Sequence, residues 1–299
     1  MNRFGKAVLG IAALGAAVIG FTSAPAHANI IQGWDFNLGN AGTGTFATAP
    51  TSATNIKQLN FSAGNSVIIQ DLSGGSALGQ PFTEKGVIQV GGYTTVGQAS
   101  NTNFTLGSAN TLYFTYSLSG TVTNTGGLVF TGGTATLILS NSTSLDPALG
   151  TNQTLATFTV VPGTGGTGLI SAGGIPSGTI QVTFKEDASS PVAKLFTLGG
   201  NDLQNVALEL ANIQPVLDNF PNGTGDSNNS FLAPLGGTCT SSNNPNAGPG
   251  ANQETVCVTE QGQLLLTVPE PSSLLLLGAG LLGLGFAARR HSKKQAIQA

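Results

Sequence analysis

The residue types that most often carry catalysis are nearly absent from this sequence. Only two histidines occur, His27 and His291, and each lies in a terminal segment. The long segment between them therefore lacks imidazole for acid–base catalysis, for Ser-His-Asp or Cys-His nucleophiles and for zinc ligation. Neither S-x-x-K nor G-x-S-x-G occurs anywhere, which excludes serine nucleophiles of those classes. We predict no catalytic residue and no enzyme activity.

Carboxylates are the remaining candidates for acid–base chemistry. Between residues 29 and 268 the sequence has twelve Asp and Glu residues, four lysines and no arginine, a formal net charge of −8. Two carboxylates flanking a sugar bond suffice for glycoside hydrolysis, so a carboxylate-only glycosidase stays open. No acid stands in a distinctive motif, and we expect Glu186 and Asp187 to be a solvated strand end. So acidic a domain is a poor partner for nucleic acid or an anionic membrane surface.

Asp226, in the segment NGTGDSNNSF, offers alternating oxygen side chains that suit a hard cation. If Asp226 were the first ligand of an EF-hand loop, Gly237 would stand where the bidentate glutamate belongs, so that motif is absent. Polar loop residues explain the stretch better, and a weak calcium site of another class stays open. The Gly-rich segments lack the lysine of a phosphate-binding loop. We predict no metal site and no cofactor.

The two cysteines, Cys239 and Cys257, are expected to form a disulfide. An exported chain reaches an oxidising compartment, and the bridge would stabilise the fold by roughly 3 kcal/mol on the loop-entropy model. A reactive or metal-binding thiol pair is the alternative, but there is neither C-x-x-C spacing nor a nearby histidine.

The elements that position these residues are predicted to be strands. Short β-branched and aromatic runs, closed by Gly, Asn, Pro or Ser, occur at residues 30–36, 55–62, 66–72, 85–97, 110–124, 126–133, 135–141, 154–161 and 178–187. Since no helical pattern separates them, we predict an all-β fold, an antiparallel β-sandwich or a jelly-roll-like domain.

Two later segments are harder to assign. Residues 202–217 fit both a strand and a helix by periodicity, and the all-β surroundings favour a strand. Residues 220–253 are rich in Asn, Gly, Pro and Ser, which indicates a long polar surface loop.

The first 28 residues have the pattern of a secretory signal peptide. Arg3 and Lys6 precede an apolar run at residues 7–21, and Ala26-His27-Ala28 supplies a small-x-small cleavage site. We predict cleavage after Ala28, which leaves an exported β-rich domain at residues 29–267. A retained membrane anchor is the alternative, but the run is short and the cleavage site follows closely.

The C-terminal segment joins a short motif, an apolar run and a basic cluster. Val268-Pro269-Glu270-Pro271 comes first, residues 272–288 follow, and the cations are Arg289, Arg290, Lys293 and Lys294. As a helix, the apolar run at residues 274–288, which four glycines interrupt, would span about 22 Å, short of the roughly 30 Å hydrocarbon core. We predict a marginal membrane helix with its basic end in the cytoplasm, rather than a buried helix of a globular domain.

This order of parts resembles the PEP-CTERM sorting signal of exported bacterial proteins, over residues 268–294. The resemblance implies recognition by a membrane protease-transpeptidase of the exosortase family, with processing near Pro269-Glu270-Pro271. It also implies temporary anchoring in the inner membrane, then release or attachment at the cell surface of a Gram-negative bacterium that makes exopolysaccharide. No family resemblance covers residues 29–268.

Three hypotheses follow for the exported domain. The leading one is a non-enzymatic surface or extracellular-matrix protein that supports biofilm or exopolysaccharide structure, with exopolysaccharide as a further partner. A lectin-like carbohydrate-binding module is the alternative, and it predicts an aromatic or Asp/Asn cluster on one exposed face. Trp34, Tyr93, Tyr113 and Tyr116 could stack on a sugar ring, but a lone aromatic in a strand more often belongs to the core. The glycosidase would require a cleft with two acids roughly 5 to 10 Å apart.

Overall fold

The computed structural model describes residues 29–41, 52–73, 75–104, 106, 110–142, 144–163, 169–170, 176–177, 180–203, 207–217, 246–247 and 252–268. In this part of the chain the protein is all-β, with two short 3-10 helices, η1 (Leu38–Ala41) and η2 (Pro147–Leu149), and no α-helix. The prediction of an antiparallel all-β fold is confirmed. The predicted signal peptide and tail helix lie outside the described residues, as does most of the predicted loop 220–253.

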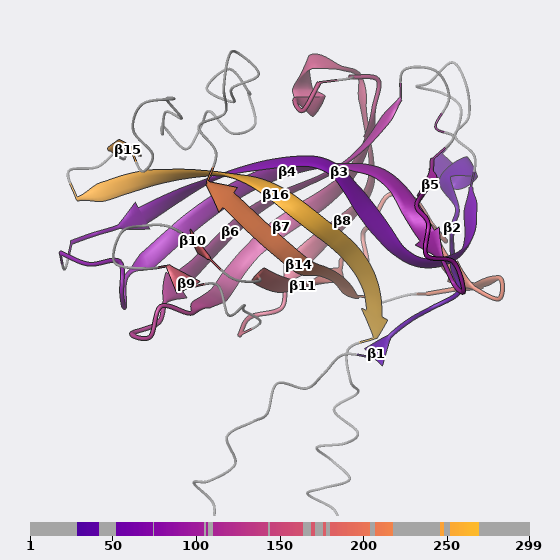
Figure 1. Cartoon of the computed structure of the whole chain (residues 1–299). Helices are drawn as coiled ribbons and strands as arrows, with labels where there is room; N and C mark the ends of the chain where they lie inside the picture. The colour runs from indigo at the N-terminus through magenta and orange to yellow at the C-terminus, as the bar shows by residue number, and fades with distance from the viewer. Residues whose placement is uncertain are drawn as a thin grey trace, which may run out of the picture. The chain divides into compact units, whose positions relative to one another are not determined.

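Eight long strands follow one another around a sheet that closes on itself. Each pairs with the next in an antiparallel ladder, and the last strand, β16, pairs with the first, β3. Figure 1 shows β3, β4 and β16 as the longest ribbons of the sheet. Because each of the eight has a partner on both edges, few of their backbone groups need other cover. Around the sheet they are β3 (Ala53–Asp71), β4 (Pro81–Thr95), β6 (Thr111–Val122), β7 (Leu128–Ser140), β8 (Asn152–Val160), β11 (Ile180–Glu186), β14 (Ala207–Leu217) and β16 (Gln253–Val268).

Short strands extend this sheet where long strands overrun their neighbours. The start of β3 projects past β16, and β2 pairs with it through Trp34–Ile56 and Phe36–Ala53. From β2 the sheet continues to β12 and β13, while β1 and β15 lie beside β16 and β5 lies beside β4. The bounds are β1 (Asn29–Ile30), β2 (Trp34–Phe36), β5 (Thr102–Asn103), β12 (Phe196–Leu198), β13 (Asn201–Asp202) and β15 (Asn246–Ala247), with β9 (Leu169–Ile170) and β10 (Pro176–Ser177) as a separate pair.

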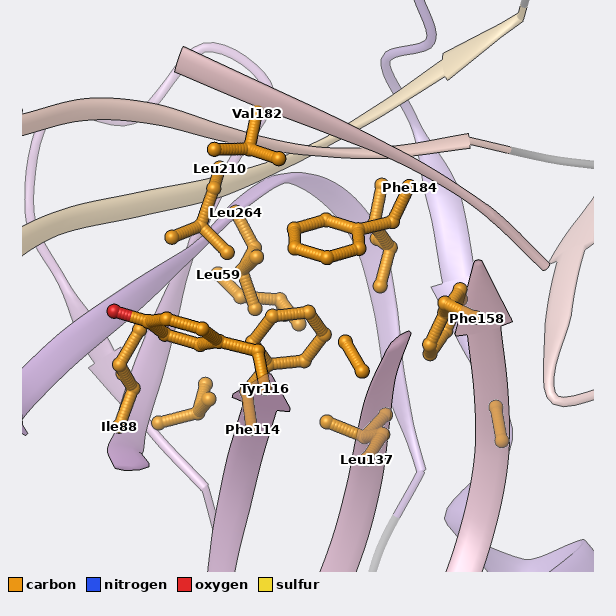
Figure 2. Close-up of a cluster of buried hydrophobic side chains, with 14 of the residues drawn as sticks. Leu59, Ile88, Phe114, Tyr116, Leu137, Phe158, Val182, Phe184, Leu210 and Leu264 are labelled. Atoms are coloured by element: carbon orange, nitrogen blue, oxygen red, sulfur yellow. The ribbon is translucent and has the colours of Figure 1, made fainter. Parts of the chain in front are cut away.

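The apolar core is filled from all eight long strands. In β6, alternate residues from Leu112 to Leu118 are buried in one cluster, which is the two-residue period of a pleated strand. The ring of Phe114 lies 5.4 Å from that of Phe184 on β11 and 6.0 Å from that of Phe158 on β8, between centroids. Burying one such ring stabilises the fold by about 1.5–3 kcal/mol. Figure 2 shows members of the cluster, Leu59, Ile88, Phe114, Tyr116, Leu137, Phe158, Val182, Phe184, Leu210 and Leu264.

A second, smaller apolar cluster uses the side chains of the opposite strand phase. Its buried members are Val67, Ile69, Val87, Tyr113 and Cys257. Cys257 is directly opposite Val67 in the ladder between β16 and β3, whereas its neighbours Val256 and Val258 belong to the main core. The pleat therefore divides the buried residues of these strands between two faces of the sheet.

The strand predictions were largely right, but several strands are longer than the local pattern indicated. Residues 55–62 and 66–72 form one strand, β3, which continues through Gly64. A Cβ at Gly64 would lie 3.1 Å from the Glu260 carbonyl oxygen, so the glycine allows close packing there. Residues 126–133 and 135–141 likewise join in β7. The ambiguous segment 202–217 is a strand from Ala207 onward. The strand β16 had no counterpart among the predictions.

Candidate functional site

The last residues of β16 lead directly into the predicted sorting motif. β16 pairs with β14 up to the Thr267–Ala207 pair. Thr267 is fully buried, and its Oγ1 donates a hydrogen bond to the carbonyl oxygen of Ala207 at 3.2 Å. Val268 ends the strand, so the chain is free of this ladder only beyond Thr267.

The predicted N-terminus of the exported domain meets the same strand end. β1 begins at Asn29, the first residue after the predicted cleavage site, and it neighbours β16 in the sheet. The Ile31 amide donates a hydrogen bond to the carbonyl oxygen of Leu266 at 2.8 Å. Near Leu266, β16 therefore has partners on both edges, so a protease that binds its substrate as an added strand cannot engage this part of the folded domain.

Residues 267–290 match the family model of the PEP-CTERM protein-sorting motif. The chain thus ends in an exosortase sorting signal, which makes it an exported, exosortase-processed protein. Because the match begins at Thr267, inside β16, no spacer separates the described sheet from the PEP-CTERM motif. No curated protein and no solved structure gives a match to the chain.

Most residues predicted to serve targeting lie outside the part of the chain that the structure describes. They are Ala26 and Ala28 at the cleavage site, Pro269, Glu270 and Pro271 of the PEP-CTERM motif, and the cations Arg289, Arg290, Lys293 and Lys294. Among the residues that are described, no helix is long and apolar enough to cross a membrane. The membrane helix at residues 272–288 stays a prediction.

An acidic pocket of about 230 Å³ lies in the domain that precedes the motif in the sequence, where β11 ends and β13 begins. Glu186, Asp187 and Asp202 line it together with Ser190 and Lys194. Asp187 is fixed by a hydrogen bond from Thr159 Oγ1 to its Oδ1 at 2.8 Å. We predicted that Glu186 and Asp187 form a solvated strand end. They are instead only partly exposed, and they line this pocket together with residues of the segment that follows β11.

Glu186 is the acid in this pocket whose ionisation is most altered. The pKa of Glu186 is raised to about 7, mainly by burial; a hydrogen bond with Ser190 lowers it, and the charges of Asp202 and Asp187 contribute to the rise. A carboxyl group that holds its proton near neutral pH can act as a general acid. The pocket is nevertheless smaller than the 300–1,000 Å³ typical of ligand sites.

Two other acids lie together inside the closed sheet. Glu84 on β4 and Glu260 on β16 are buried, and the hydroxyl group of Tyr116 on β6 contacts both carboxyl groups. The Tyr116 oxygen lies 3.0 Å from Glu84 Oε1 and is also hydrogen-bonded to Glu260 Oε1. Figure 2 shows the Tyr116 hydroxyl directed away from Phe158 and Phe184, at the edge of the apolar cluster.

Burial controls the ionisation of this group. It raises the pKa of Glu260 to about 8, with the charge of Glu84 as the next cause, and it also raises the pKa of Glu84. The pKa of Tyr116 is raised well above its ordinary value, again mainly by burial. Glu260 therefore retains its proton at neutral pH, and burial makes Glu84 and Tyr116 hold theirs more tightly than free side chains do. None of the three groups is open to a substrate. This cluster could not be predicted from local patterns, because Glu84 and Glu260 are 176 positions apart in the sequence.

The residue that the sequence analysis considered for metal binding is not among those that the structure describes. Asp226, the predicted candidate for a hard cation, lies outside them. Within them, no group of three or more His, Cys, Asp or Glu side chains is placed to hold a metal ion.

The aromatic residues proposed for sugar stacking belong mainly to the core. Trp34, Tyr113 and Tyr116 are buried. Tyr93 is only partly buried, but its ring packs against that of Phe104, with centroids 4.9 Å apart. Among the described residues, these four aromatic side chains therefore do not form the exposed sugar-stacking surface that the lectin-like hypothesis predicted.

A cluster of Asn and Gln side chains lies on β3 and at β5; the lectin-like hypothesis predicted an aromatic or Asp/Asn cluster, and this one contains no Asp. Four amides bond head to tail: Gln58 Nε2 donates to Asn60 Oδ1 at 2.7 Å, and Asn60 Nδ2 donates to Asn101 Oδ1 at 2.7 Å. Asn101 Nδ2 then makes a weak bond to Asn103 Oδ1 at 3.5 Å. Asn101 and Asn103 are exposed. We call these four residues the amide chain.

Only one of the two cysteines falls in the described part of the protein. Cys257 is fully buried in the second apolar cluster. Cys239 lies outside the described residues, and the bridge between them stays a prediction.

Proposed function

We propose that this exosortase-sorted protein is a non-enzymatic component of the cell surface or extracellular matrix of a Gram-negative bacterium, where it supports biofilm or exopolysaccharide structure. The supporting observation is the direct connection of the PEP-CTERM motif to β16 of a closed sheet. The motif delivers the protein, and the closed sheet provides a domain with few unpaired strand edges to present outside the cell. Before processing, residues 272–288 anchor it in the inner membrane.

The placement of the acids supports a role without catalysis. Glu84 and Glu260 are buried among core side chains, so a polysaccharide cannot reach them. The pocket that contains Glu186 is small for a sugar ring and its leaving group. If the purified protein released reducing sugar from a polysaccharide panel, and Glu186→Gln abolished the release, the non-enzymatic proposal would be wrong.

Sorting is tested by expressing the full chain with and without a cognate exosortase. Intact mass and cell fractionation identify the C-terminus and the location of each product. We expect an exosortase-dependent product that ends at or beyond Val268, because Thr267 is buried and paired with Ala207. The same full-length, membrane-bound protein in both strains would contradict sorting.

The matrix role needs a separate assay in the native host. A deletion strain should retain less exopolysaccharide in its cell pellet, and the full chain should restore it. A chain that ends at Val268 is the matched control, since it keeps the domain but lacks the rest of the PEP-CTERM motif. Equal retention in the deletion and wild-type strains would refute the matrix role and leave sorting untouched.

A carbohydrate-binding surface module is the second candidate, and the amide chain favours it. Amide groups donate and accept hydrogen bonds in one plane, which suits adjacent sugar hydroxyls. Their mutual hydrogen bonds would hold them in place before a sugar binds, which reduces the ordering cost. Asn101→Ala with Asn103→Ala should weaken glycan binding, whereas Asn152→Ala, an exposed change on β8, should not. Equal binding by all three proteins would exclude this site.

A further inference from the structure

A polar cluster formed by side chains from four strands lies inside the closed sheet. Ser66 on β3, Glu84 on β4, Tyr116 on β6 and Glu260 on β16 are each at most 3% exposed. Ser66 lies beside both carboxyl groups. All the polar atoms that these side chains contribute are oxygens, and four separate strands converge to bring them together. We call this group the oxygen cluster.

The hydrogen bonds within the oxygen cluster do not satisfy all of its atoms. Tyr116 has a single hydroxyl hydrogen, yet its oxygen is within hydrogen-bonding distance of both Glu84 and Glu260. Glu260 Oε2 and Ser66 Oγ are buried and make no hydrogen bond of normal geometry, although Ser66 and Glu84 lie close enough to Glu260 to shift its pKa. A buried polar atom without a partner costs about 1–3 kcal/mol, and more when it is charged. Two such atoms in one cluster indicate that another group belongs there.

The charge of the oxygen cluster indicates what that group is. No Lys, Arg or His is among the groups that act on Glu84 or Glu260. Lys85 follows Glu84 in β4, and the pleat directs its side chain to the opposite face of the strand. When no cation is present, burial favours the protonated, neutral form of both carboxyl groups. One divalent cation would displace these protons and balance the charge of both carboxylates.

We propose that the oxygen cluster binds one calcium-class divalent cation. Both carboxylates, the Tyr116 hydroxyl and the Ser66 hydroxyl together supply up to six oxygens, and calcium takes six to eight oxygen ligands. The unpartnered Glu260 Oε2 and Ser66 Oγ are then ligands. Magnesium fits less well because it keeps several of its waters, and zinc or copper prefers nitrogen and sulfur ligands.

The proposed site links four strands of the closed sheet. β16 is the strand that closes the ring, and Glu260 belongs to it. A cation bound to Glu260 and to residues of β3, β4 and β6 would stabilise closure. Because the residues are buried, calcium should enter during folding and leave slowly, so a chelator should remove it fully only when the protein unfolds.

The first test measures calcium in the native protein. Protein purified from calcium-containing medium is desalted, and its metal content is determined by mass spectrometry, with thermal unfolding followed at rising calcium concentration. We expect one calcium per chain and a midpoint that rises with calcium. A metal-free protein whose midpoint is the same in calcium and in EGTA would overturn the proposal.

Matched variants separate a cation site from a carboxyl pair that only shares a proton. Glu260→Gln and Tyr116→Phe keep the side-chain shape but remove ligands, while Glu254→Gln changes an acid of the same strand outside the cluster. We expect calcium affinity to fall by more than about tenfold in the first two and not in the third. If Glu260→Gln instead raises the unfolding midpoint and no variant changes the calcium response, a shared proton occupies the cluster and the proposal fails.

Discussion

Replacing Gly86 by alanine tests whether the core depends on the close approach of Tyr116 to β4. A Cβ at Gly86 would lie 2.1 Å from Tyr116 Cζ and 2.3 Å from its hydroxyl oxygen. Since carbon atoms pack at about 3.5 Å, the ring would have to move by about 1.4 Å. That shift would overpack the core, at about 1–3 kcal/mol, and break the bonds of Tyr116 to Glu84 and Glu260, at about 1–3 kcal/mol. We expect Gly86→Ala to lower the free energy of unfolding by about 2–6 kcal/mol.

Urea denaturation of the exosortase-processed protein measures this change, and Gly132→Ala on β7 is the matched control. The nearest atom to a Cβ at Gly132 is Ser119 Oγ, at 3.6 Å, which is an ordinary contact. The control should therefore stay within about 1 kcal/mol of wild type. If Gly86→Ala unfolded within about 1 kcal/mol of Gly132→Ala, the core would not depend on this contact, and the interior described for Tyr116 would be wrong.

Three further predictions concern the chain end, the buried acids and the cysteines. A short Gly-Ser spacer between Thr267 and Val268 should speed exosortase processing in pulse–chase experiments, because it keeps the motif intact and separates it from the paired end of β16; an unchanged rate would show that the strand end does not limit access. In calcium-free buffer, the free energy of unfolding should fall as pH rises from 4.5 to about 8, because the folded protein holds a proton on Glu260 that the unfolded chain releases; urea titrations should show this slope in wild type and a smaller slope in Glu260→Gln, where the raised pKa of Glu186 still contributes. Non-reduced protein should have no thiol that reacts with iodoacetamide after unfolding, and a Cys239→Ser, Cys257→Ser protein should be less stable by roughly 3 kcal/mol; two reactive thiols would refute the disulfide.

The strands could be predicted from the sequence because their signal is local. Alternating apolar residues identify β6 and β8 without knowledge of their partners. Closure of the sheet could not be predicted in this way, because it depends on the pairing of β16 with β3, which are far apart in the sequence. Gln253 and Asp71, the pair in this ladder with the smallest separation, are 182 residues apart. The segment after Cys257 also contains Glu260 in an inward position, and an acid there argues against burial when its partner Tyr116 is unknown.

The difference between local and long-range signals also explains which sites could be predicted from the sequence. The PEP-CTERM motif is contiguous, so its order of parts is visible along the chain. The acidic pocket is assembled from the end of β11, the following turn and β13, and only folding brings Glu186 near Asp202. The oxygen cluster draws its four residues from four strands, and none of them stands in a local motif.

The contiguity of the closing strand and the sorting motif also implies an order of events during export. β16 pairs with β3 through Leu264 and with β14 through Thr267, so the sheet is complete only after these residues have left the membrane. Before closure, an enzyme that binds extended peptides would meet an unpaired strand as well as the motif. After closure, Thr267 is buried and the β14 ladder ends there. Folding of the domain thereby protects its last strand and leaves the PEP-CTERM motif as the segment offered to the exosortase, which explains how the motif can follow β16 without a spacer.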